Sequence, residues 1–373
     1  MWPPRRDLLR LFLIGAALFN RCPPSGAAEP VSSVEDAPIA PPARDKTPHD
    51  APPARSVRTD IPLDAQARQT AERVIPFIQQ KGTAWIKERS CLSCHYSGYM
   101  LWSLRDAGQR GFSVDQGKVA EAASWGMSQS NQVGFGIEGA AQMLIARDRS
   151  DQGETTRKRI ESLRDVIVNG QAKAGFWEPG GQLPAQKRPL METTQVSTML
   201  CVLALDSLDK PNEKGIASRD KGLTWLKQTP PNGESSAVSS EWYALRLVIE
   251  TKFGDPKHVE ALRDKILSAQ HSDGGWGWLL ADKSDAFGTG VSVYALSQVG
   301  VPNSAAAIQK AWRFLIETQT ENGSWIVNGT KTATKDKPHP FSGFWGSTWA
   351  LLGLSHSLPA TKPNENRAHP GGS

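Results

Sequence analysis

The chain has 373 residues, enough for two or three average domains, and 43 basic against 38 acidic side chains give it a formal net charge of +5. Its composition is that of an ordinary soluble globular protein, apart from plentiful Trp (13) and Pro (26). No basic cluster alternates with aromatic residues, which argues against nucleic acid as a partner.

Residues 1–28 have the pattern of a signal peptide. Arg5 and Arg6 precede an apolar run over residues 8–19, and the small residues Gly26, Ala27 and Ala28 follow. The run is too short to span a bilayer comfortably, so a cleaved signal is favoured over a signal anchor. The paired arginines also resemble a twin-arginine signal. We therefore expect an exported protein, periplasmic or extracellular in a bacterium, without a transmembrane domain after signal removal.

Two segments at the ends of the mature chain are predicted to be disordered. Residues 29–62 are rich in Pro and Ala with scattered charge, and residues 359–373 have a similar composition. Such segments bury too little apolar surface to offset the entropy lost on ordering. The sequence therefore predicts one folded repeat domain over residues 63–358.

A turn signal recurs through this domain: a glutamine at the end of a helical segment, then a glycine and an aromatic residue. Three copies are ungapped, namely Gln171 to Trp177, Gln270 to Trp276 and Gln319 to Trp325. Looser copies start at Gln79 and Gln129, and a copy at Gln228 lacks the aromatic residue. The repeat length is roughly 48 residues, which indicates a repeat architecture.

Helical segments precede and follow each turn. Segments before the turns carry charge on one face, and those after them are apolar nearly all round, which predicts outer and inner helices respectively. The outer helices are expected over residues 70–78, 119–128, 157–168, 219–227, 259–269 and 305–318, and the inner helices over 98–107, 137–147, 193–207, 240–251, 288–299 and 346–356. No segment is predicted to be a strand. We expect an all-α fold, an α/α toroid of about six helix pairs rather than an open solenoid.

Two segments carry a family resemblance that extends over residues 65–357. The run from Lys310 to Trp325 resembles the QW motif of squalene and oxidosqualene cyclases, and the run from Asp285 to Leu296 resembles an inner helix of the terpenoid cyclase and protein prenyltransferase repeat. The resemblance implies a single α/α barrel with a substrate-binding central cavity. It also implies that each glutamine and aromatic residue ties neighbouring outer helices together, a stabilising role.

The sequence Cys91-Leu-Ser-Cys94-His95 is the attachment signature of a c-type haem. In this motif both thiols form thioethers with the haem, and the histidine becomes the proximal iron ligand. A disulfide between Cys91 and Cys94 and a shared metal ion are the alternatives. Twin-arginine export of a folded chain would conflict with haem attachment to unfolded thiols.

The motif lies within the first repeat, so a distal iron ligand must come from elsewhere. Met191 and His339 each lie shortly before an inner helix and are the candidates, while a five-coordinate iron is the alternative. Cys201 lies among apolar neighbours and is expected to be a buried small hydrophobe.

The segments before the inner helices should meet at one rim of the toroid, where Glu192, Glu241 and Asp285 are candidate catalytic acids. Capping of the inner helices is the alternative for Glu241 and Asp285. The Asp-rich acid motif of squalene cyclases is absent, and the spacing of Asp282 and Asp285 does not match it. Whether the protein is an enzyme is therefore left open.

These observations favour an exported toroid protein that carries haem c at its rim for electron transfer or redox sensing. A terpenoid cyclase-type enzyme and a non-catalytic binding scaffold with a Cys91–Cys94 disulfide are the rivals. The corresponding partners are a redox protein or a hydrophobic small molecule.

Overall fold

The computed structural model describes residues 60–89, 94–129, 136–181, 183–209, 212–228 and 237–361. All of them belong to one compact unit, Asp45–Ser373. The predicted signal peptide, Cys91 and nearly all of the predicted linker and tail lie outside the described residues.

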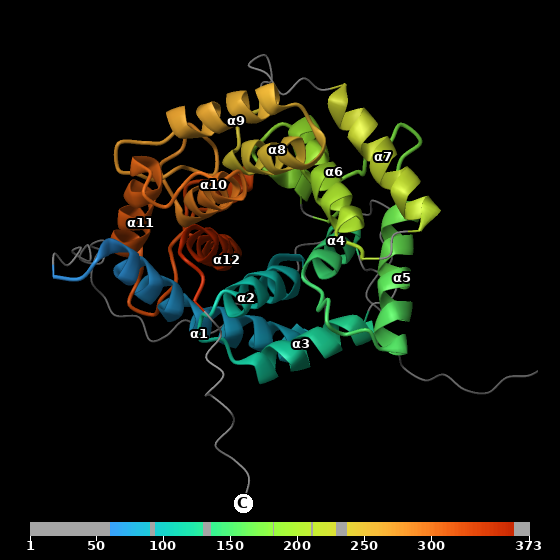
Figure 1. Cartoon of the computed structure of the whole chain (residues 1–373), viewed down its shortest axis with the longest axis horizontal. Coiled ribbons are helices and arrows are strands. Elements are labelled where there is room, and N and C mark those ends of the chain that lie inside the picture. The colour runs from blue at the N-terminus through green and yellow to red at the C-terminus, as the bar shows by residue number, and fades with distance from the viewer. Residues whose placement is uncertain are drawn as a thin grey trace, which may run out of the picture. The chain divides into compact units, whose positions relative to one another are not determined.

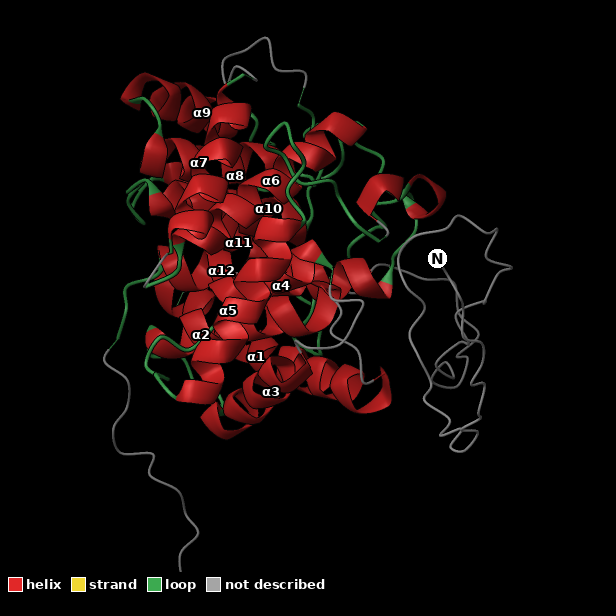
Figure 2. Cartoon of the chain, turned by 90° about the vertical axis from the view of Figure 1, so that its right-hand side faces the viewer, coloured by secondary structure: helices red, strands yellow, loops and turns green. Residues whose placement is uncertain are grey.

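Within these ranges the chain forms two concentric layers of helices (Figures 1 and 2). The outer layer consists of α1 Leu63–Arg89, α3 Gln116–Gln129, α5 Glu154–Asn169, α7 Glu213–Lys227, α9 Pro256–Ser268 and α11 Ala306–Thr318. The inner layer consists of α2 Tyr99–Gln109, α4 Ile137–Ile145, α6 Leu190–Asp206, α8 Ser240–Phe253, α10 Ala286–Gln298 and α12 Pro340–Ser357. Short helical turns occur at Cys94–Gly98, Leu183–Ala185 and Thr332–Thr334.

The inner helices form a closed circle. Each even-numbered helix packs against the next one, and α12 packs against α2. The only β-structure in the described part of the chain is isolated bridges. The predicted α/α toroid of six helix pairs is therefore confirmed.

Three of the predicted glutamine–tryptophan turns are fully described, and each makes the same set of hydrogen bonds. The amides of Gln171, Gln270 and Gln319 donate to the glycine carbonyl of their own turn and to a carbonyl of the following outer helix. The indole of the tryptophan donates to a carbonyl of the preceding outer helix, 2.7 Å from Trp177 Nε1 to Ile167 O in the first case. The indole bonds satisfy carbonyls in the last turn of the preceding outer helix, and the glutamine bonds tie the turn to the following outer helix, as the stabilising role predicts.

The turn at Gln319 closes the outer layer. Its amide donates to Thr70 O of α1 at 2.9 Å, and its Oε1 accepts from Arg73 Nε at 2.8 Å. The last outer helix is thereby bonded to the first one. The outer layer is therefore closed at the same place as the inner circle, where α12 packs against α2.

Gly323 in the same turn has a φ of +85°, a conformation that glycine adopts without strain. A Cβ at this position would lie 2.2 Å from the carbonyl oxygen of Arg73 in α1. Gly175 and Gly274 occupy equivalent places against α7 and α11. The glycine of the motif therefore serves both the turn and the close contact with the next outer helix.

One predicted turn is wrong. Residues 79–85 do not form a turn, because α1 runs without interruption from Leu63 to Arg89. The segment between Gln79 and Trp85 contains one glycine and no proline, which a long helix tolerates. Gln79 nevertheless still bonds the next outer segment, since its Nε2 donates to Asp115 O at 3.2 Å. The turns after Gln129 and Gln228 lie outside the described residues.

Candidate functional site

The edge of the toroid at which the inner helices begin is the predicted rim, and Glu241 is one of its buried acids. Its side chain is 1% exposed, and its Oε2 accepts a hydrogen bond from Arg188 Nη1 at 2.7 Å. Burial raises the pKa of Glu241, while the charge of Arg188 opposes this increase. The cap of α8 is Ser239, whose hydroxyl accepts from Trp242 N, so the expectation that Glu241 caps the helix is wrong.

Glu192 is buried at the start of α6 and holds the segment that leads into α8. Its Oε2 accepts from Val238 N at 2.8 Å, and its Oε1 accepts from Ser239 N and from the Ser239 hydroxyl. Both oxygens are therefore engaged by the chain itself.

Asp285 caps α10, as the alternative interpretation predicted. Its Oδ1 accepts from Gly288 N at 2.7 Å and its Oδ2 from Trp278 N at 2.9 Å. Burial raises the pKa of Asp285 to about 6, against the opposing effect of these backbone donors. All three predicted acids thus make structural hydrogen bonds.

A strap formed by residues 183–189, before α6, is bonded to segments near two other inner helices. Lys187 N donates to Thr330 O at 2.9 Å, and Gln186 forms an antiparallel bridge with Lys331. The Lys187 ammonium pairs with Asp282. Because Thr330 precedes α12 and Asp282 precedes α10, the strap joins three parts of the rim.

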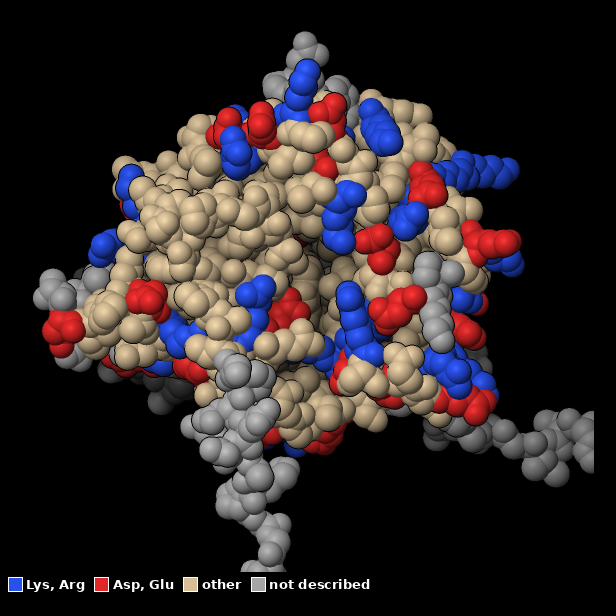
Figure 3. Space-filling model, in the orientation of Figure 1, with Lys and Arg blue, Asp and Glu red and all other residues tan. Residues whose placement is uncertain are grey.

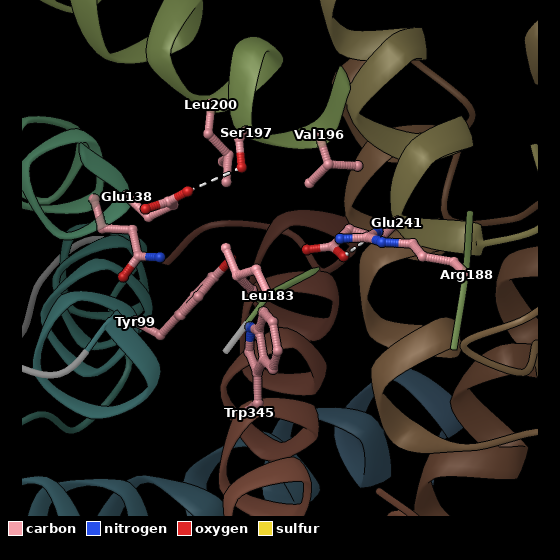
Figure 4. Close-up of a pocket in the computed structure, with 10 residues that line it drawn as sticks. Tyr99, Glu138, Leu183, Arg188, Val196, Ser197, Leu200, Glu241 and Trp345 are labelled. Atoms are coloured by element: carbon pink, nitrogen blue, oxygen red, sulfur yellow. Dashed lines mark hydrogen bonds and ion pairs between the residues drawn. The ribbon is translucent and has the colours of Figure 1, made fainter. Parts of the chain in front are cut away.

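The strap contributes Leu183 and Arg188 to a pocket at the centre of the toroid (Figure 4). Figure 4 shows Glu138 on one side of the pocket, the Arg188–Glu241 pair on the other, and Tyr99 and Trp345 between them. The remaining lining residues are Gln142, Val196, Ser197 and Leu200. The free space has room for about one water molecule.

Sequence reasoning found Glu241 but missed the other polar residues of this pocket. Arg188 lies 53 positions before its partner Glu241, and no motif connects the two. Glu138 and Gln142 are four residues apart on α4, a spacing that could have indicated a shared helix face.

The neighbourhood of the Cys-x-x-Cys-His motif is described from Cys94 onward, although the side chains of Cys94 and His95 lie outside the described part. The turn Cys94–Gly98 is π-helical and packs against α1, α4 and α12. Tyr96 stacks on Trp85 with ring centroids 4.5 Å apart and also contacts Phe341 and Phe344. We call Trp85, Tyr96, Phe341 and Phe344 the rim aromatic cluster. Burial raises the pKa of Tyr96 to about 12.

The two predicted distal ligands lie in different surroundings. The imidazole of His339 stacks on Phe341 of the rim aromatic cluster, with centroids 5.3 Å apart. Met191 is 58% exposed at the start of α6, which packs between α4 and α8. The structure thus brings His339, but not Met191, to the aromatic residues beside the motif. Cys201 is fully buried in α6, as predicted.

Charged side chains of both signs are interspersed on the face shown in Figure 3, without a large area of one sign. Among the described residues, no three His, Cys, Asp or Glu side chains are grouped as a metal site. No helix of the described residues is long and apolar enough to cross a membrane.

No family model matches the chain. A curated relative is squalene–hopene cyclase of Zymomonas mobilis subsp. mobilis, 25% identical over 234 residues. The match covers 62% of this chain but only 31% of the relative, so the chain spans about a third of that enzyme's length.

Solved structures with the same arrangement come from enzymes of different activities. A possible GH105 family member from Salmonella enterica serovar Paratyphi A aligns with a TM-score of 0.58 at 12% identity, covering 82% of this chain and 96% of that one. The type II terpene cyclase MstE from Scytonema, in complex with geranylgeranyl dihydroxybenzoate, gives 0.52 at 11% identity over 80% and 99%. Unsaturated glucuronyl hydrolase from Bacillus sp. GL1 gives 0.51 at 11% over 78% and 96%. At these identities the likeness shows the fold alone: the chain has a squalene-cyclase-like α/α toroid.

Proposed function

We propose that this protein is an exported redox protein that carries haem c at the rim of its toroid. Cys91 and Cys94 would form the two thioether bonds, and His95 would be the proximal iron ligand. The observation that carries the proposal is the Cys-x-x-Cys-His sequence, whose continuation Cys94–Gly98 lies at the rim beside the rim aromatic cluster. When bound, the haem would supply reversible one-electron transfer.

The described residues around the motif suit a haem. Aromatic side chains next to Tyr96 offer an apolar surface, which would suit the macrocycle and would shield it from water. His339 borders this surface through Phe341 and is the distal ligand that we favour over Met191. A position at the rim would also leave the haem within reach of a redox partner protein.

The rival function, cyclisation of a polyisoprenoid in the central cavity, has less support. A cyclase needs an acid that can protonate the substrate, and the carboxylates of Glu192, Glu241 and Asp285 are bonded to Arg188 or to backbone groups. The space at the centre holds about one water molecule, far less than an isoprenoid needs.

The proposal is tested by expressing the full chain, signal included, in a bacterium that matures c-type cytochromes. We expect a reduced absorption spectrum with a c-type α-band, and a chromophore that stays with the protein after acid–acetone extraction. The double variant Cys91→Ala/Cys94→Ala should lose the chromophore and keep its helical circular dichroism. Cys201→Ala is the matched control and should keep both.

A colourless protein with two accessible thiols, or with a reducible disulfide between Cys91 and Cys94, would contradict haem binding. The disulfide result would favour the scaffold function instead.

A further inference from the structure

The central pocket contains a buried carboxylate without a cationic partner. Glu138 is 4% exposed, and its Oε1 accepts hydrogen bonds from Gly180 N at 2.9 Å and Ser197 Oγ at 3.0 Å. Among the described residues, no Lys, Arg or His pairs with Glu138, and its Oε2 accepts no hydrogen bond. Glu241 differs, because Arg188 compensates its charge. A buried charge without compensation is costly, so Glu138 requires an explanation.

A second acceptor in the same pocket also lacks a donor. Gln142 is 3% exposed, and its Oε1 has no hydrogen-bond partner among the described residues. Glu138 and Gln142 are four residues apart on α4, so their side chains share one face of the helix. A buried acceptor without a donor costs about 1–3 kcal/mol. Because both residues line the pocket, a small positively charged group in it would compensate the charge of Glu138 and lie beside the unsatisfied side chain of Gln142.

The rest of the pocket suits a cation of limited size. Tyr99 and Trp345 line it with ring centroids 5.5 Å apart, and aromatic faces attract cations. Two carboxylates and one guanidinium line the pocket, which leaves one uncompensated negative charge when both carboxylates are ionised. The free space admits about one water molecule, so an extended organic amine does not fit.

We propose that this pocket binds one small monovalent cation, of the size of ammonium or potassium. Glu138 supplies the negative charge, Gln142 supplies a neutral oxygen, and Tyr99 and Trp345 line the pocket beside them. The proposal is independent of haem binding, because none of these groups belongs to the Cys-x-x-Cys-His motif.

Thermal unfolding of the full chain in different chloride salts at constant ionic strength tests the proposal. When N-methyl-glucamine is replaced by ammonium or potassium, we expect the Tm to rise and then saturate with concentration, as mass action requires for one site. The comparison of ammonium, potassium, sodium and methylammonium identifies the preferred ion. Anomalous scattering from thallium(I) in crystals would locate it.

Glu138→Gln should abolish the ion dependence, and its Tm in N-methyl-glucamine should equal or exceed that of the wild type, because the buried charge is gone. Gln142→Met keeps the side-chain volume and should shift the saturation to higher ion concentration. Glu260→Gln, on the exposed face of α9, is the matched control and should respond like the wild type.

Equal Tm values in all salts for the wild type would overturn the proposal, as would an undiminished ion dependence in Glu138→Gln. If Glu138→Gln does not fold, the wild-type salt series and Gln142→Met decide the matter. Equal values there would overturn the proposal as well.

Discussion

The Arg188–Glu241 pair is a buried ion pair that connects several segments of the rim. Both side chains are buried, and Arg188 also donates from Nε to Thr193 Oγ1 at 3.1 Å and lies over the ring of Trp278. One guanidinium thus connects the strap to α6, to α8 and to the segment before α10. Its loss would leave a carboxylate buried without its charge partner.

Arg188→Met is therefore expected to lower the free energy of unfolding by about 3–5 kcal/mol, the usual cost of removing one partner from a buried ion pair. Urea denaturation followed by circular dichroism measures the loss. The double variant Arg188→Met/Glu241→Gln should recover much of it, because the uncompensated charge is then absent. Arg313→Met, exposed on α11, is the control and should change stability by less than about 0.5 kcal/mol.

The distal ligand gives a second prediction at this scale, which applies to the haem-loaded protein. His339→Ala should convert a six-coordinate, low-spin iron spectrum into a high-spin one, because the imidazole beside Phe341 is removed. Met191→Ala should leave the spectrum unchanged, since Met191 is exposed on α6. The reverse pattern would assign Met191 as the ligand. No effect from either variant would indicate a five-coordinate iron or another ligand.

At the scale of the helices, each of the three described glutamine–glycine–tryptophan turns bonds one outer helix to the next. The same donors recur in three turns, and the backbone amides of Trp177, Trp276 and Trp325 also donate to a hydroxyl of the following inner helix. Each turn therefore fixes three helices at once. The glycine of each turn is the residue at which substitution is least tolerated, because an added Cβ would collide with the backbone of the next outer helix.

Gly323→Ala is expected to destabilise the protein by more than Gly300→Ala. Both glycines have positive φ, +85° and +79°, so both variants incur a strain of about 1–2 kcal/mol. Only at Gly323 does the added Cβ collide with a backbone carbonyl, whereas nothing lies within 4 Å of it at Gly300. The difference in unfolding free energy between the two variants measures the cost of the collision between the added Cβ and the carbonyl of Arg73. Equal losses would show that the contact relaxes without cost.

The helix arrangement was predictable because its signals are local. Glutamine, glycine and aromatic residues mark the helix ends, and apolar periodicity separates inner from outer helices. The extension of α1 was not predictable, because the sequence from Gln79 to Trp85 fits the turn pattern and a continuous helix equally well. The pocket could not be predicted from the sequence, for a different reason. Arg188, Glu138 and Trp345 come from three distant segments, and only the closed toroid brings them together.

At the scale of the whole toroid, the C-terminal end of the described chain returns to the first helix pair, α1 and α2. Arg68 Nη2 donates to Pro359 O, and Thr361 N donates to Arg110 O at 3.2 Å. The chain termini, which lie between α12 and α1, could therefore also be placed between other helices of the toroid.

A circular permutant should fold for this reason. A flexible linker of about eight residues would join residue 361 to residue 60, and the new ends would lie between Pro302 and Asn303, in the exposed turn before α11. We expect unchanged helical circular dichroism and a Tm within a few degrees of the wild type. New ends between Met199 and Leu200, inside buried α6, should prevent folding. If both permutants failed alike, the native order of the chain would be essential.

The joint between Gln319 and α1 has a consequence for the order of events during synthesis. Its partners Thr70 and Arg73 are 249 and 246 positions earlier in the chain. Their hydrogen bonds to Gln319 can therefore form only after almost the whole domain has been synthesised. Until then the nascent domain is an arc with an unprotected apolar side, and such late, long-range contacts slow folding. Tyr96 meets Phe341 and Phe344 only when the last helix arrives. Tyr96, five residues after Cys91, thus lacks these two aromatic neighbours for most of the time that a ribosome needs to finish the protein.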